Sequence, residues 1–399
     1  MVKNSYVLLI AFALFAENIT AQCTGNRYRD QIFSNTTKTT VTYSTVYNLA
    51  MDIYTPTGDN VTNRPAILLA HGGSFTGGNR NEPTIVELCK RFAKRGYVTA
   101  SMSYRLATNP FDMTQPSTGY PVVVKAMSDA KAAIRYLKAN ATTYGIDSNL
   151  IIVGGNSAGA ILMLHLAWVD DSTEAATEPI IINAVNNNGG IEGNSGNPGP
   201  TSKVVAIIDW AGGIKDTSWI SPNDEPVVAL HGDPDGTVPY NYGQVLGGFS
   251  QITLHGPGSY TKRANNVGLK YWHKRYPNGD HQPWGLSGSG AVFDEADSIT
   301  MEFLYQEVIC KTSAALHEPS SLYSINIHPN PASDVIHVSL SEYSPNTLVV
   351  LSDLQDREWM RYAAAPVVTI SSSHLPAGVY LVKVLDQNRT VATMRVVVQ

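Results

Sequence analysis

The sequence has little cysteine and little charge of either sign. It holds 3 cysteines in 399 residues, 15% of its residues are charged, and the formal net charge is -5. So few cysteines exclude a disulfide-rich scaffold. Without a basic run, neither nucleic acid nor an anionic membrane is expected as a partner. No cluster of His, Cys or carboxylate residues has the spacing of metal ligands, so the sequence predicts no metal and no cofactor.

Long apolar runs are also scarce. Residues 1–21 combine a basic residue, Lys3, with a short apolar core at residues 7–16 and a small residue, Ala21, at the expected cleavage point. This pattern is typical of a secretory signal peptide, and the core is too short to span a bilayer. We therefore expect an exported protein with no stable membrane span.

In an oxidising compartment one pair of cysteines is expected to be oxidised. Cys23 and Cys310 would join the two ends of the first folded domain, whereas Cys89 lies in an apolar-periodic segment typical of a buried free thiol. A lipid-anchored Cys23 is disfavoured because Gln22 stands where such signals have a small residue.

Strand and helix patterns alternate through most of the chain, and 43% of the residues are hydrophobic. Short β-branched runs predict buried strands, and longer periodic runs predict helices. Their alternation predicts an α/β fold, a mostly parallel sheet with helices on both faces. The expected strands are residues 66–70, 97–104, 150–154, 204–209, 227–230 and 269–275, and the expected helices are 83–95, 125–139 and 160–168, after antiparallel edge strands within 39–54.

Two polar insertions, residues 107–120 and 170–202, are too long for plain connections. Each is either a lid or substrate-facing loop, or an ordinary surface excursion. Residues 311–322 have the composition of a linker, and residues 323–399 show only short strands with turn residues between them, which predicts a small C-terminal β-sandwich. The first folded domain is thus expected to span residues 22–310.

Residues 150–159 contain the motif that most strongly indicates a catalytic site. The strand at 150–154 is followed by Gly155-Asn-Ser157-Ala-Gly159 and then by an apolar helix, so Ser157 is expected on a sharp strand-to-helix turn. Small neighbours are needed there because the chains pass closely. The Gly-x-Ser-x-Gly pattern alone is weak, and the flanking elements are what support it.

A serine hydroxyl becomes a nucleophile only when a base takes its proton and a third group holds that base. His281, in a turn after the last expected strand, is the candidate base. Asp235 is the candidate third group, and Asp233 on the same loop is its alternative. The chain order Ser, Asp, His is that of α/β-hydrolases.

Residues 40–310 resemble the α/β-hydrolase esterases, especially the carboxylesterase and polysaccharide-esterase branches, through His-Gly-Gly at 71–73 and Gly-x-Ser-Ala-Gly at 155–159. The resemblance implies a secreted serine ester hydrolase that works through an acyl-enzyme. Its substrates would be extracellular esters, such as acetyl or feruloyl esters of polysaccharides, glycerides or polyesters. The implied residues are Ser157 as nucleophile, His281 as base, Asp235 as orienter, and Gly72, Gly73 and Ala158 as oxyanion-hole donors.

The chain departs from the lipase-like branch at Ser74, where that branch has a third glycine, so the resemblance leaves open which amides line the hole. Aromatic residues near these motifs are candidates for a substrate pocket. Aromatic residues are more often core than pocket, but some could line an acyl or alcohol pocket: Phe75, Trp210 and Trp284, with Tyr120 beside them. Structural roles are expected for the remaining histidines of these segments: His71, His165 and His231.

The tail resembles the C-terminal sorting domain of the type IX secretion system, through Ile-His-Pro-Asn-Pro-Ala-Ser-Asp at 327–334 and Leu-Pro-Ala-Gly-Val-Tyr-Leu-Val at 375–382. This implies passage through that secretion machinery to the outside or the cell surface. A carbohydrate-binding or adhesion sandwich is the alternative for this tail. For the whole chain the alternatives are a prolyl-oligopeptidase-type serine peptidase and a catalytically silent hydrolase-fold binding module.

Overall fold

The computed structural model describes residues 25–310, 325–340, 343–345, 347–353, 357–386 and 389–399. The expected signal peptide, Cys23 and the expected linker at 311–322 lie outside these ranges. Cys310 is disulfide-bonded and Cys89 is a buried free thiol. The chain divides into two compact units, Met1–Lys311 and Thr312–Gln399.

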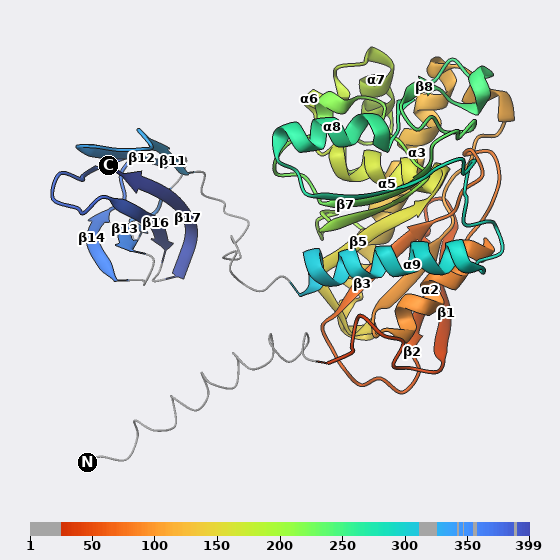
Figure 1. The fold of residues 1–399 in the computed structure, drawn as a ribbon, viewed down its shortest axis with the longest axis horizontal. Coiled ribbons are helices and arrows are strands. Elements are labelled where there is room, and N and C mark those ends of the chain that lie inside the picture. The colour runs from red at the N-terminus through yellow and green to blue at the C-terminus, as the bar shows by residue number, and fades with distance from the viewer. Residues whose placement is uncertain (1–24, 311–324, 341–342, 346, 354–356, 387–388) are drawn as a thin grey trace. The chain divides into compact units, whose positions relative to one another are not determined.

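The first unit is built on an eight-stranded sheet in the order β1-β2-β4-β3-β5-β6-β7-β10 (Figure 1). The pairings β1–β2 and β2–β4 are antiparallel, and all others are parallel. The predicted mostly parallel sheet is therefore confirmed. Its strands are β1 (Thr36–Ser44), β2 (Leu49–Pro56), β3 (Arg64–Ala70), β4 (Val98–Met102), β5 (Ile146–Asn156), β6 (Ala206–Trp210), β7 (Val227–Gly232) and β10 (Tyr271–Tyr276).

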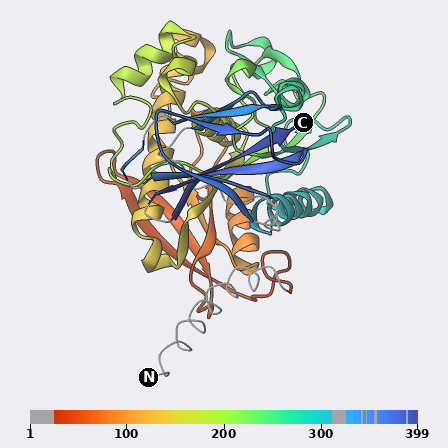
Figure 2. The ribbon, with the colours of Figure 1, turned by 90° about the vertical axis from the view of Figure 1, so that its left-hand side faces the viewer.

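Helices cover both faces of this sheet, which is why β3, β4, β6 and β7 are buried along their whole length. Helices α2 (Pro83–Lys94) and α9 (Ala291–Phe303) enclose one hydrophobic core, and α3 (Pro116–Ala139), α5 (Ala158–Trp168) and α8 (Pro257–Val267) enclose the other. Figures 1 and 2 show the two groups on opposite sides of the strands. Every residue of α5 is buried, as its nearly all-apolar sequence requires.

The two insertions are more helical than their polar composition indicates. The first contains η1 (Pro110–Thr114) and the start of α3 at Pro116, well before the helix expected at 125–139. Proline is compatible with a first helical turn, and Tyr120, Val124 and Met127 supply an apolar face. The second contains α6 (Ser172–Ala175) and α7 (Pro179–Asn187). The remaining short elements are α4 (Ala141–Tyr144), η2 (Thr217–Trp219), β8 (Tyr242–Gln244), η3 (Leu246–Gly248), β9 (Thr253–His255) and η4 (Leu304–Ile309).

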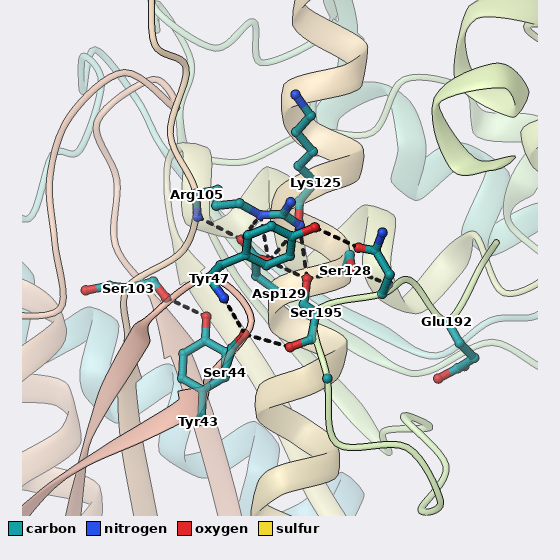
Figure 3. A network of polar contacts seen from close by, with 12 residues as sticks. Tyr43, Ser44, Tyr47, Ser103, Arg105, Lys125, Ser128, Asp129, Glu192 and Ser195 are labelled. Atoms are coloured by element: carbon teal, nitrogen blue, oxygen red, sulfur yellow. Dashed lines mark hydrogen bonds and ion pairs between the residues drawn. The ribbon is translucent and has the colours of Figure 1, made fainter. Parts of the chain in front are cut away.

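A buried polar network fixes the end of the second insertion to α3 (Figure 3). Ser195 donates a hydrogen bond to Asp129 Oδ1 at 2.6 Å, and the Ser195 and Ser128 hydroxyls lie 2.7 Å apart. Arg105 Nε donates to Asp129 Oδ1 at 2.9 Å, and Ser44 donates to the Ser195 carbonyl at 2.6 Å. Segments from β1, α3 and the insertion are thus joined at one point, which sets where α7 can lie.

The second unit consists of two small antiparallel sheets that share one hydrophobic core. Alternation of buried and exposed residues along its strands gives each sheet one apolar face. The sheets are β11-β12-β15, with β11 (Ile325–His328), β12 (Val335–Leu340) and β15 (Val367–Ser371), and β14-β13-β16-β17, with β13 (Thr347–Asp353), β14 (Glu358–Ala363), β16 (Gly378–Asp386) and β17 (Arg389–Val398).

Candidate active site

Ser157 occupies a strained turn between β5 and α5. Its backbone has φ 55° and ψ −120°, a conformation that costs energy for a residue with a Cβ. The turn is held by a hydrogen bond from Ser157 N to the Trp210 carbonyl at 2.8 Å. A Cβ on Gly159 would lie 2.1 Å from the Ala70 carbonyl oxygen, so only glycine lets α5 start this close to β3.

Three side chains from three loops form one hydrogen-bonded chain. His281 Nε2 lies 2.9 Å from Ser157 Oγ, and His281 Nδ1 lies 2.6 Å from Asp235 Oδ2. The loops follow β5, β7 and β10, whose carboxyl ends share one edge of the sheet, as ligand-binding loops do in parallel sheets. Since the carboxylate accepts from Nδ1–H, Nε2 is left free to accept the serine proton.

Several hydrogen-bond donors surround the Asp235 carboxylate and hold it in place. Its Oδ1 accepts hydrogen bonds from the amides of Thr237 at 2.7 Å and Val238 at 2.9 Å, and His231 Nε2 lies 3.1 Å from Oδ2. Burial acts to raise the pKa of Asp235, but hydrogen bonds from His231 and His281 outweigh it and hold the pKa well below the usual range of a carboxyl. The group opposite His281 is therefore a carboxylate at neutral pH. Sequence reasoning gave His231 only a role at the strand end and missed this contact.

The alternative acid, Asp233, is engaged elsewhere. It pairs with the Arg275 guanidinium and accepts a hydrogen bond from Asn278 N at 2.7 Å. The structure thus brings Asp235, and not Asp233, to His281.

The His281 loop is tied directly to the serine turn. Asn156 Nδ2 donates to Gln282 Oε1 at 2.8 Å, and Gln282 itself has a left-handed φ of 58°. Gly232 allows the end of β7 to pass the same loop, because a Cβ there would lie 1.9 Å from the Gly279 carbonyl oxygen. Asn156 and Gln282 carry no sequence signal of their own, since only the fold makes them neighbours.

The predicted oxyanion donors lie beside the serine. A Cβ on Gly72 would lie 3.3 Å from Ser157 Cβ, and the chain then turns through φ 114° at Gly73, 54° at Ser74 and 59° at Phe75. Within the described ranges, the amides of Gly72, Gly73 and Ser74 donate no hydrogen bond to the protein. Ala158 supplies the first amide of α5, which has no acceptor inside the helix. Ser74 adopts the left-handed conformation that a third glycine would have allowed.

Two further histidines are held in neutral, structural roles. His71 Nδ1 lies 2.7 Å from the Gly72 carbonyl and its ring stacks on Tyr104 at 4.4 Å, while burial lowers its pKa. His165 donates from Nδ1 to the Ile161 carbonyl at 2.7 Å and accepts at Nε2 from Lys215 N at 3.1 Å. Burial lowers the pKa of His165 to about 4.

A cavity opens at Ser157 between α3, α5, α7 and the β8–β9 hairpin. Nearly all the surface that it exposes is apolar. Of the aromatic side chains predicted to contact substrate, Phe75 and Tyr120 line it. The lining comprises Ser74, Phe75, Met113, Tyr120, Val123, Val124, Met127, Ser157, Ala158, Ile161, His165, Val169, Ile181, Val185, Lys215, Trp219, Thr237, Val238, Val245, Leu246, Ile252 and Leu254.

The structure corrects two assignments. Trp210 and Trp284 pack against each other at 4.8 Å in the core beneath α2 and α9, with exposed fractions of 0% and 2%. They line no part of this cavity, so the predicted substrate contact is wrong for both. Trp210 lies at the end of β6 with its indole N–H donating to Thr300 Oγ1 at 3.0 Å, which fixes it in the core. Trp219, which no motif marked, lines the cavity instead.

Among the residues that the structure describes, no group of three or more His, Cys, Asp or Glu side chains is placed to hold a metal ion. No described helix combines the length and the hydropathy that a membrane span needs.

The sheet order and the serine turn define an α/β-hydrolase. Residues 51–218 match the family model BD-FAE, and residues 326–399 match the secretion system C-terminal sorting domain. Residues 51–218 thus match the BD-FAE family within an α/β-hydrolase fold, and residues 326–399 match a sorting domain that indicates secretion or the cell surface, so both resemblances found in the sequence are confirmed.

Curated relatives match only part of the chain. Gut esterase 1 of Caenorhabditis elegans is 28% identical over 122 residues, which is 30% of this chain and 21% of that protein. The neuroligin-like protein glit-1 of the same organism is 32% identical over 115 residues, 28% of this chain and 15% of that protein. The chain thus spans about a fifth or less of the length of these relatives.

Solved structures resemble the fold. Esterase 2 of Thermogutta terrifontis, phosphoramylated by tabun, is 20% identical and superposes with a TM-score of 0.51, covering 67% of this chain and 93% of that one. The propionate-bound form of the same esterase is 19% identical, with the same TM-score and coverage. At this identity the likeness shows a shared fold.

Proposed function

We propose that the chain hydrolyses carboxylic esters outside the cell through an acyl-enzyme on Ser157. The observation that carries this proposal is the hydrogen-bonded chain from Ser157 Oγ through His281 to Asp235, with distances of 2.9 and 2.6 Å. Substrates that suit an exported enzyme are acyl esters of polysaccharides, glycerides or polyesters.

In the first step Ser157 attacks the ester carbonyl while His281 Nε2 takes its proton. The carbonyl oxygen becomes an oxyanion, which accepts hydrogen bonds from backbone amides of the 72–74 loop and of Ala158. His281 then gives the proton to the departing alcohol. Asp235 holds the Nδ1–H tautomer and stabilises the imidazolium that forms in between.

In the second step a water molecule takes the place of the alcohol. His281 accepts its proton, the resulting hydroxide attacks the acyl carbon, and the carboxylic acid leaves as Ser157 regains its proton. The His281 ring is partly exposed, with 16% of its side chain accessible, which gives water a path to Nε2.

Hydrolysis of p-nitrophenyl butyrate by the full chain tests this proposal. Ser157→Ala is expected to lower kcat on the order of 10⁶-fold, since the nucleophile of such a triad accounts for most of the rate. Ser289→Ala, an exposed serine, is the control and should leave kcat unchanged. Equal turnover by wild type and Ser157→Ala would refute the proposal. Faster cleavage of aminoacyl-proline amides than of esters would favour a peptidase, and glycan binding without turnover would favour a silent binding module.

A further inference from the structure

The cavity at Ser157 is long and follows one helix. Ser157, Ile161, His165 and Val169 all line it, and a spacing of four residues places them on one face of α5. At 1.5 Å per residue, the row from Ser157 to Val169 extends about 18 Å. On the opposite wall α7 contributes Ile181 and Val185 at the same spacing.

The cavity lies on the acyl side of the reacting carbon. The leaving alcohol must contact His281 Nε2, because that atom returns the proton to it. Ser157 and Ala158 line the cavity, but His281 is absent from its lining residues. A group held in the cavity is therefore attached to the carbonyl on the side away from His281, which is the acyl side.

The walls offer almost nothing to a polar acyl group. Both nitrogens of His165 are already hydrogen-bonded to the backbone. The Lys215 ammonium pairs with Glu178 at 3.3 Å and lies 5.9 Å from the Tyr120 ring centre. The other polar groups of the lining are the hydroxyls of Ser74, Tyr120 and Thr237, so a substrate hydroxyl placed away from them would lose its hydrogen bonds to water without replacement. Met113 and Met127 have flexible side chains, which adapt to a substrate of variable shape.

We propose that this cavity binds a flexible aliphatic acyl chain of intermediate length, so that esters of medium-chain fatty acids are preferred over acetyl and hydroxycinnamoyl esters. This inference rests on the proposed ester hydrolysis. It concerns only the acyl half of the substrate and leaves the alcohol unspecified.

The first experiment measures kcat/KM of the full chain for p-nitrophenyl acetate, butyrate, hexanoate and octanoate. Each methylene that enters an apolar site is expected to raise kcat/KM roughly fourfold, so hexanoate should exceed acetate by about 10²-fold. A profile that is flat or falls from acetate to octanoate would overturn the inference. So would a higher kcat/KM for p-nitrophenyl ferulate than for the octanoate.

The second experiment blocks the cavity with a tryptophan at one of two distances from Ser157. Ile161 lies one helical turn from Ser157, about 6 Å along the axis, and Val169 lies about 18 Å away. Ile161→Trp should abolish the rise in kcat/KM from acetate to butyrate and beyond, whereas Val169→Trp, which lies past the end of an extended octanoyl chain, should keep the rise through octanoate and lose it only for longer chains. Asn183→Trp, on the exposed side of α7, is the matched control and should keep the wild-type profile.

The far-UV circular dichroism spectrum and the midpoint of thermal unfolding report folding in every variant. Val169→Ala, which widens the far end, provides a second measurement if a Trp variant does not fold, and should shift the optimum to longer chains. An Ile161→Trp variant that lowers acetate and octanoate hydrolysis by the same factor would overturn the inference. If the wild type hydrolyses none of these esters, the proposed function itself fails, whereas Ser157-dependent hydrolysis with no chain-length preference refutes the acyl cavity alone.

Discussion

The loops that carry Ser157, Asp235 and His281 and the helices that wall the cavity meet at one serine, but they are built differently. The loops are constrained by positive φ angles, by glycines at close approaches and by hydrogen bonds to Asp235 and His281. The cavity walls come from α5, the β8–β9 hairpin and the two insertions, and are held by side-chain packing and one remote polar network. Precise geometry is therefore concentrated at the proposed proton transfers, and adaptable packing at the proposed acyl-binding cavity. Mutations in the loops should consequently change the rate of reaction, whereas mutations in the cavity walls should change substrate preference or stability.

Of the comparisons that follow, the largest expected difference in kcat is between variants of Asp235 and Asp233, the two carboxylates of the loop after β7. Asp235→Asn is expected to lower kcat on the order of 10⁴-fold, because an amide in this place favours the wrong His281 tautomer. Asp233→Asn is the matched control and removes only an exposed ion pair with Arg275, so kcat should stay within about twofold. Initial rates with a short p-nitrophenyl ester measure both. Comparable losses in the two variants would contradict the assignment of Asp235.

The next effect concerns His165 in the cavity wall and depends on pH. Its folded-state pKa of about 4 lies below the usual 6.5, so the unfolded chain binds the proton more readily. Neutral His165 therefore contributes its full stabilisation above pH 6.5. As the pH falls from 6.5 to about 4, the free energy of unfolding should decrease by roughly 3 kcal/mol. Urea unfolding at pH 7 and pH 4 should show this loss, and His165→Gln should reduce it. An identical pH dependence in the variant would show that His165 is not the group responsible.

A smaller effect tests the network that positions the second insertion. Gly193 has φ +71° and a Cβ there would lie 2.1 Å from Ser128 Oγ, whereas Gly190 has φ +81° with nothing within 4 Å. Gly190→Ala should cost about 1 kcal/mol of backbone strain. Gly193→Ala should cost about 1–3 kcal/mol more, because it also displaces Ser128 from its hydrogen bonds. Equal free energies of unfolding for the two variants would show that the network contributes nothing.

The smallest effect compares the two compact units. Removing residues 312–399 should change kcat/KM for a short ester by less than about twofold, since a domain with its own core folds independently. The truncated protein should no longer be exported by cells that export the full chain. A large loss of activity in the purified truncated protein would mean that the first unit depends on the second.

The sequence predicted the sheet and the serine turn because both depend on local patterns. Strands β3 and β5 each contain a short apolar run, at residues 66–70 and 150–153, that is followed by glycines, and such runs are buried wherever they fold. It does not predict the start of α3, because the first turns of this helix contain two prolines, which are typical of a loop. It also failed at Trp210 and Trp284, because an aromatic residue near a motif is equally compatible with a core and a pocket.

Residue order and local periodicity by themselves determined the α/β class, the sharp turn at Ser157, the histidine after the last strand and the β-rich tail, whose resemblance to a sorting domain rests on its motifs. Only the tertiary structure decided that Asp235 and not Asp233 reaches His281, that Asn156 contacts Gln282, and that α3, α5 and α7 enclose one apolar cavity. The physical reason is that hydrophobic periodicity acts over one helix or strand. The distance between two side chains on different loops depends on how whole elements pack, which no short stretch of sequence records.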